Sequence, residues 1–184
     1  MCILLIVGII IGAIAIKTLN VEERDGIVNF FNSFFKLLNK DDVNSNQLLK
    51  ESVTSNIKTI IIIWLTGVFV IGIAIIPIIV ILRGFAIGFT VGFLVNEYGV
   101  RGFLFSVFAL LPQNVFIIPG IISISSIGIN YALKKVKQKS NGLKTNFINY
   151  SSCIFLSCIL ILLGCLVEAF ISPLFMKFIV GNLN

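Results

Sequence analysis

Apolar residues occupy most of this chain in long runs, and two stretches between them are polar. The apolar runs cover about residues 2–18, 57–96, 102–133 and 147–172, and the polar stretches are 19–56 and 134–146. A helix needs about 20 apolar residues to cross a bilayer, and 57–96 is long enough to cross twice. The pattern therefore predicts about five transmembrane helices.

The boundaries of the middle spans follow from glycine and proline. Because these residues permit tight turns, a turn between Gly72 and Pro77 would divide 57–96 into spans at 57–74 and 75–96. A hydrophilic turn at 96–101 follows. The run 102–133 is too long for a straight span, and Pro112 and Pro119 each remove a backbone donor, so we expect a kinked or broken fourth helix.

The first run, 2–18, lacks the basic flank and the small-residue cleavage pattern of a signal peptide, so we expect a first span. Its shortness leaves open whether the start of the chain is complete. The expected fold class is all-α, a polytopic integral membrane protein forming a single membrane domain over 1–184. It has about five transmembrane helices, a broken fourth helix and one extracytoplasmic amphipathic helix.

Composition and charge agree with a membrane protein and orient it. The chain of 184 residues is 58% hydrophobic and 12% charged, against about 25% charged in soluble domains. Residues 17–58 hold equal numbers of cations and anions, so most of the net charge of +6 comes from Lys134, Lys135, Lys137, Lys139 and Lys144. The positive-inside rule places the basic loop 134–146 in the cytoplasm, facing anionic lipid, and 19–56 and the carboxyl terminus outside. We expect no nucleic-acid binding.

The outer stretch 19–56 contains an amphipathic helix. Its apolar side chains recur at helical spacing and share one face: Ile27, Phe30, Phe31, Phe34, Phe35 and Leu38. Two interpretations stay open. The phenylalanines either lie in the lipid interface or against neighbouring helices, or they form a docking face for a partner.

A glycine stripe and a group of polar residues lie inside the apolar runs. Gly84, Gly88 and Gly92 recur at every fourth position, which favours close packing against another helix. The expected intramembrane polar cluster consists of Arg83, Gln113, Asn114 and Glu168. From the expected span limits, Arg83 lies about 12 Å and Glu168 about 22 Å from the cytoplasmic side. We therefore expect Arg83 to pair with Gln113 and Asn114 rather than with Glu168.

The residue types argue against catalysis and metal binding. The chain has no histidine, and its four cysteines have no CxxC spacing. We expect no cofactor and no metal, since histidine and paired cysteines are the usual ligands of transition metals. No nucleophile and base, paired carboxylates or phosphate loop is recognisable, so we expect a protein that is not an enzyme.

Several motifs, in order along the chain, carry a family resemblance: FFNSFFKLL, LRGFAIGFTVGFLV, YGVRG, LPQNVFIIPG and VEAFISP. In these the sequence resembles stage II sporulation protein M over almost its whole length. The resemblance implies a role in endospore formation. It implies a membrane anchor that holds the peptidoglycan hydrolases, stage II sporulation proteins D and P, at the septum for engulfment of the forespore. It also implies location in the bacterial cell membrane, in the mother-cell or septal membrane during sporulation.

A different class of function also accounts for some of these features. An intramembrane arginine, a broken helix and a glycine stripe are typical of small channels and transporter subunits, in which discontinuous helices line the substrate site. Partners distinguish the two classes. Cell-wall hydrolases favour the scaffold, whereas an ATPase or a solute-binding protein favours transport.

Overall fold

The computed structural model describes residues 1–39, 45–137 and 143–176. Side chains are described for all of these residues except 32, 34–39, 137 and 143–146. Within these ranges the regular elements are all helices. They are α1 (Cys2–Ala15), the 3-10 helix η1 (Ile16–Thr18), α2 (Val21–Asn39), α3 (Ser45–Val68), α4 (Gly72–Lys137), α5 (Leu143–Leu166) and the π-helix η2 (Val167–Ile171). The expected all-α class is confirmed for the described residues.

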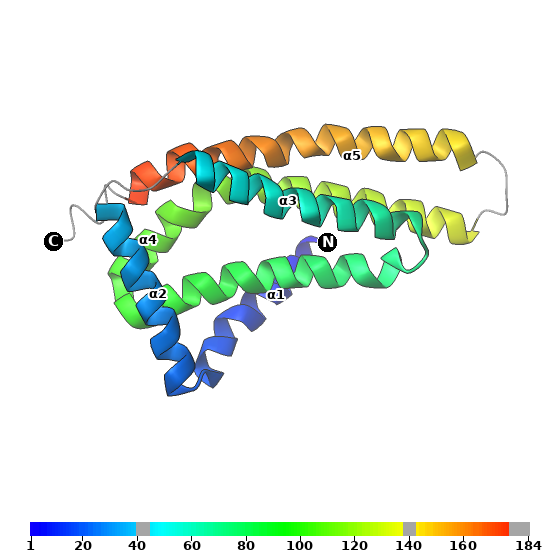
Figure 1. Ribbon diagram of the computed structural model, residues 1–184. Coiled ribbons are helices and arrows are strands. Elements are labelled where there is room, and N and C mark those ends of the chain that lie inside the picture. Colours follow the sequence, from blue (N-terminus) through cyan, green and yellow to red (C-terminus); the bar gives the residue numbers. More distant parts are fainter. Residues whose placement is uncertain (40–44, 138–142, 177–184) are drawn as a thin grey trace.

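Helix α4 consists of two arms that fold back on each other (Figure 1). A straight helix of its 66 residues would be about 99 Å long, three times the thickness of the bilayer core. The arms, 72–98 and 100–137, meet at Gly99, whose φ of 56° and ψ of −133° lie outside the helical region. Glycine adopts this conformation without a clash of a Cβ atom. Gly99 lies inside the hydrophilic turn expected at 96–101.

The two arms of α4 pack with α3 and α5, and successive segments run in alternating directions (Figure 1). Their shared core contains Ile63 of α3, Ile76 of the first arm, Ile121 of the second arm and Tyr150 of α5. The Tyr150 hydroxyl donates a hydrogen bond to the carbonyl oxygen of Trp64, at 2.9 Å. The apolar runs therefore bury one another's faces and keep a large apolar area exposed.

Helix α1 packs in parallel on the first arm of α4. Carbonyl oxygens of Leu5 and Ile9 lie against Gly84 and Gly88, and Ala13 lies beside Gly92. Two glycines of α1, Gly8 and Gly12, lie in turn against the backbone of the first arm. The expected glycine stripe thus faces a second glycine pair, whose four-residue spacing is visible in the sequence.

The helix limits differ from the expected span limits at three places. The turn before α4 lies at 69–71 rather than between Gly72 and Pro77, and α3 begins at Ser45 rather than near 57. Residues after Pro173 continue as helix to Met176. Residues 45–56 look like a loop because polar side chains occur on all sides of that segment, but burial of two of them, Ser52 and Asn56, holds the helix against its neighbours.

Pro112 and Pro119 do not break the fourth helix, so of the two expected forms, kinked or broken, the broken one is wrong. Both lie inside α4, and the non-helical backbone of α4 is at Gly99. Figure 1 shows a change of direction along the second arm instead. Packing on both sides of a proline can hold the helix together, so that the ring clash produces a kink.

The stretches of the described chain that can cross a membrane do not confirm the expected number of spans. By length and hydropathy, two stretches of the described chain can cross a membrane, Gly72–Val136 and Phe147–Met176. The pair Cys2–Thr18 and Val21–Phe31, bent by 114°, brings the number to three. The count of about five is not confirmed. Helix α3 does not qualify, because its first half carries many polar and charged residues.

Candidate functional site

Arg83, near the middle of the first arm of α4, binds an amide of α3. Its Nη2 donates to Oδ1 of Asn56 at 2.9 Å. Asn56 is 3% exposed, and its Nδ2 donates to the carbonyl oxygen of Ser52 at 2.9 Å and to Sγ of Cys165 at 3.4 Å. One buried amide therefore links α3 to both α4 and α5.

Glu168 completes this arrangement from the π-helix η2. The hydroxyl of Ser52 donates to its Oε2, and Glu168 is close enough to interact electrostatically with Arg83. We call these five residues the polar network: Ser52, Asn56, Arg83, Cys165 and Glu168. Helices of the π type are rare and occur often at functional sites.

The polar network holds one cation and one anion, with an amide and a hydroxyl between them. Each charge has a polar partner, which a charge at membrane depth requires. The hydrogen bonds of the polar network can fix the relative positions of α3, α4 and the segment formed by α5 and η2. Because nearby water is not needed to satisfy these groups, the network suits a structural role.

The expected polar cluster is split by the structure. Gln113 is buried and its Oε1 accepts a hydrogen bond from the hydroxyl of Ser172 at 2.9 Å. Asn114 donates to the carbonyl oxygen of Leu110 in its own helix, at 2.8 Å. The expected pairing of Arg83 with Gln113 and Asn114 is wrong.

The reason for this error is the early start of α3. The polarity of residues 45–56 predicts an outer loop, which would keep their side chains away from the depth of Arg83. In the structure, Ser52 and Asn56 lie four residues apart on one face of α3 and point into the bundle. That spacing is the sequence signal that could have identified them.

The phenylalanine face of α2 is partly occupied by the chain itself. Phe31 stacks on Phe93 of α4, with ring centroids 5.8 Å apart and planes at 18°. Phe30 is 67% exposed. The side chains of Phe34 and Phe35 lie outside the described residues. Phe31 therefore fits the interpretation in which the phenylalanine face packs on neighbouring helices. Phe30 is exposed and can contact other molecules.

An ion pair also holds α2 to the turn of α4. The Nε of Arg24 lies 2.6 Å from Oε1 of Glu97. Together with the Phe31 stack, this pair fixes α2 across the ends of the long helices (Figure 1).

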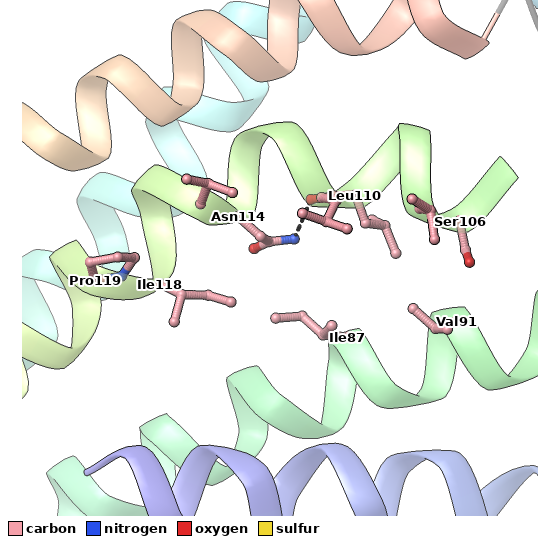
Figure 2. A pocket seen from close by; sticks show the side chains of 10 residues that line it. Ile87, Val91, Ser106, Leu110, Asn114, Ile118 and Pro119 are labelled. Atoms are coloured by element: carbon pink, nitrogen blue, oxygen red, sulfur yellow. Dashed lines mark hydrogen bonds between the residues drawn. The ribbon is translucent and has the colours of Figure 1, made fainter. Parts of the chain in front are cut away.

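A groove of about 380 Å³ lies between the two arms of α4 (Figure 2). Ile87 and Val91 line one side, and residues from Ser106 to Pro119 line the other. Figure 2 shows the Asn114 amide bound back to Leu110. The groove is therefore apolar, and a lipid chain can fill it without a specific polar contact.

Metal ligands are not grouped in the described residues. No three His, Cys, Asp or Glu side chains there lie close enough to hold a metal ion. The cysteines among these residues are free thiols.

The helical fold, its apolar exposed surfaces and the internal polar network define an integral membrane protein of the all-helical class. The family model for stage II sporulation protein M matches residues 1–173. The chain belongs to this family of sporulation membrane proteins, as its motifs indicated. Searches of curated proteins and of solved structures gave no match.

Proposed function

We propose that this protein is a non-catalytic membrane anchor that holds the peptidoglycan hydrolases stage II sporulation proteins D and P at the septum during engulfment. The observation that carries the proposal is that α2 is tied to α4 by two contacts and exposes an aromatic side chain. Arg24–Glu97 and Phe31–Phe93 hold it across the bundle, and Phe30 stays exposed. A helix that is tied to the bundle and carries an exposed aromatic side chain is a suitable site for a protein partner.

The internal contacts favour this role over transport. Arg83 and Glu168 are engaged with Asn56 and Ser52, so both charges have partners within the chain. A substrate site would need some of these groups to be available to a solute. The polar network therefore supports a scaffold more than a channel or a transporter subunit.

The exposed aromatic residue provides the test. We expect Phe30→Ser to leave the protein in the membrane at normal abundance and to disperse fluorescently tagged hydrolases from the septum. We expect the same dispersal in a strain from which the whole protein is deleted. The reason is that Phe30 is exposed and contributes little to the bundle. Septal hydrolase in the Phe30→Ser strain, with dispersal in the deletion strain, would place the docking site elsewhere. Septal hydrolase in both strains would contradict the proposed function.

Orientation in the membrane is the second part of the proposal. The lysine-rich end of the bundle is cytoplasmic, and α2 and the carboxyl terminus lie outside. Single cysteines are introduced at Lys134 and Glu23, both exposed, in a variant without native cysteines. We expect an impermeant maleimide to label Glu23→Cys in intact cells and Lys134→Cys after lysis alone. The reverse pattern would invert the topology.

A further inference from the structure

The first half of α3 has a polar stripe on its exposed side, opposite to the buried Ser52 and Asn56. Its members are spaced by three or four residues, so they share one face, and they line a hollow of about 570 Å³: Gln47, Lys50, Glu51, Thr54, Ser55 and Lys58. We call this the α3 stripe. All six residues are exposed, and the polar network does not use them.

The α3 stripe lies at the same depth as an apolar surface. Asn56 contacts Cys165. The α5 residues around Cys165 that face outward are Leu162, Leu163 and Leu166, which are 45%, 44% and 45% exposed. Ser52 likewise contacts Glu168, and nearby Phe170 and Ile171 are exposed. These side chains belong to the candidate span Phe147–Met176, so the stripe lies beside a membrane-crossing segment, although α3 by itself is too polar to count as a span.

The position of Lys58 along α3 agrees with this depth. The Nζ of Lys135 donates to the carbonyl oxygen of Val68, which places the end of α3 at the level of the lysine-rich end. Lys58 precedes Val68 by ten residues, or about 15 Å, which is half of the hydrocarbon thickness of about 30 Å. A lysine facing lipid at that depth is costly.

Lys58 lacks a countercharge within the described residues, since no carboxylate there forms an ion pair with it. Glu51, on the same face, is seven residues away and accepts a hydrogen bond from Gln47 at 3.4 Å. Seven residues correspond to about 10 Å along the helix. The hydroxyls and the amide of the stripe can form hydrogen bonds with a polar neighbour. The positive charge of Lys58 would be neutralised by a carboxylate from another molecule.

We propose that the α3 stripe binds a transmembrane helix of another protein, and that a carboxylate near the middle of that helix pairs with Lys58. A second copy of this chain fits less well. In a two-fold dimer with its axis along the membrane normal, each residue of α3 meets its own equivalent, so Lys58 would face Lys58. The inference rests on the proposed function in one respect, because it names a surface by which the anchor holds a membrane-bound partner.

Binding of a defined helix in vesicles tests the proposal. Purified full-length protein with a donor dye is reconstituted at pH 8 with acceptor-labelled synthetic leucine-alanine transmembrane peptides. One peptide carries a single Glu at its centre and the other a Gln. Because polar contacts between membrane helices contribute about 1–2 kcal/mol, we expect the Glu peptide to bind roughly tenfold more tightly by energy transfer.

Three variants locate the contact. Lys58→Leu is expected to abolish the preference for the Glu peptide, and Lys58→Arg to retain it. Lys134→Leu removes an exposed lysine at the end of the second arm and is expected to change nothing. Equal binding of both peptides by the unaltered protein would overturn the proposal. So would energy transfer between two labelled copies of the chain that is lost in Lys58→Leu, because it would make the occupant a second copy.

This assay contains no hydrolase, so it tests peptide binding at the α3 stripe independently of the proposed anchor function. Peptide selectivity lost in Lys58→Leu, combined with septal hydrolase in a deletion strain, would uphold the stripe and contradict the anchor role. Equal binding of the two peptides, combined with dispersed hydrolase in the deletion strain, would uphold the anchor role and contradict the proposed binding at the α3 stripe.

Discussion

Replacing Gly88 by leucine is expected to reduce the amount of protein in the membrane by about tenfold or more. A Cβ at this position would overlap the carbonyl oxygen of Ile9, and also approach that residue's backbone carbons. Backbone cannot rotate away as a side chain can, so α1 must separate from the first arm of α4. Overpacking costs about 1–3 kcal/mol even where a core adjusts, and such losses change cellular abundance several-fold.

The matched control is another helical glycine. Gly26 lies in α2, is exposed, and has no atom within 4 Å of the position that a Cβ would occupy. Gly26→Leu is expected to accumulate normally, as measured by quantitative immunoblotting of membranes. Normal abundance of Gly88→Leu would show that α1 and α4 do not need this close contact.

Removing the charge of Arg83 is the second change with a large expected effect. Arg83→Met keeps much of the side-chain length, but it leaves Oδ1 of Asn56 without its donor and Glu168 without the neighbouring cation. Truncating one partner of a buried charge pair costs about 2–5 kcal/mol. We expect Arg83→Met to unfold in detergent at a clearly lower temperature than the unaltered protein.

Two further variants separate charge from packing. Arg83→Met with Glu168→Gln removes both charges, so it is expected to recover part of the lost stability. Arg24→Met removes an arginine whose side chain is half exposed, and it is expected to unfold like the unaltered protein. A double variant no more stable than Arg83→Met would mean that the two charges do not compensate each other.

The sequence pattern is sufficient for the helical class and for several packing features. The turn of α4 lies where glycine follows polar residues, and the glycine stripe lies at a close helix contact, as its spacing predicts. Both depend on local properties of the chain, namely the absence of a Cβ atom and the period of the helix. Such properties can be read without knowing which helices are neighbours.

The partners of the polar residues could not be predicted in the same way. Ser52 and Asn56 belong to a segment whose polarity resembles that of a loop, and only contact with Cys165 and Glu168 shows that it is a packed helix. The two prolines mislead the prediction in a different way, because they suggest a break where the structure has a helix. Pro112 and Pro119 predict a broken helix, but tertiary contacts on both sides keep α4 helical through them.

The parallel contact between α1 and α4 also sets an order of events during synthesis. Gly8 of α1 lies against the segment of α4 around Gly84, and the positions 8 and 84 are 76 residues apart in the chain. At about 5–20 residues per second, a ribosome needs roughly 4–15 s to make that distance. For this interval α1 stays in the membrane without its glycine-lined neighbour, held by whatever lipid or insertion machinery surrounds it. The packing of α1 therefore has to wait for the synthesis of the first arm of α4.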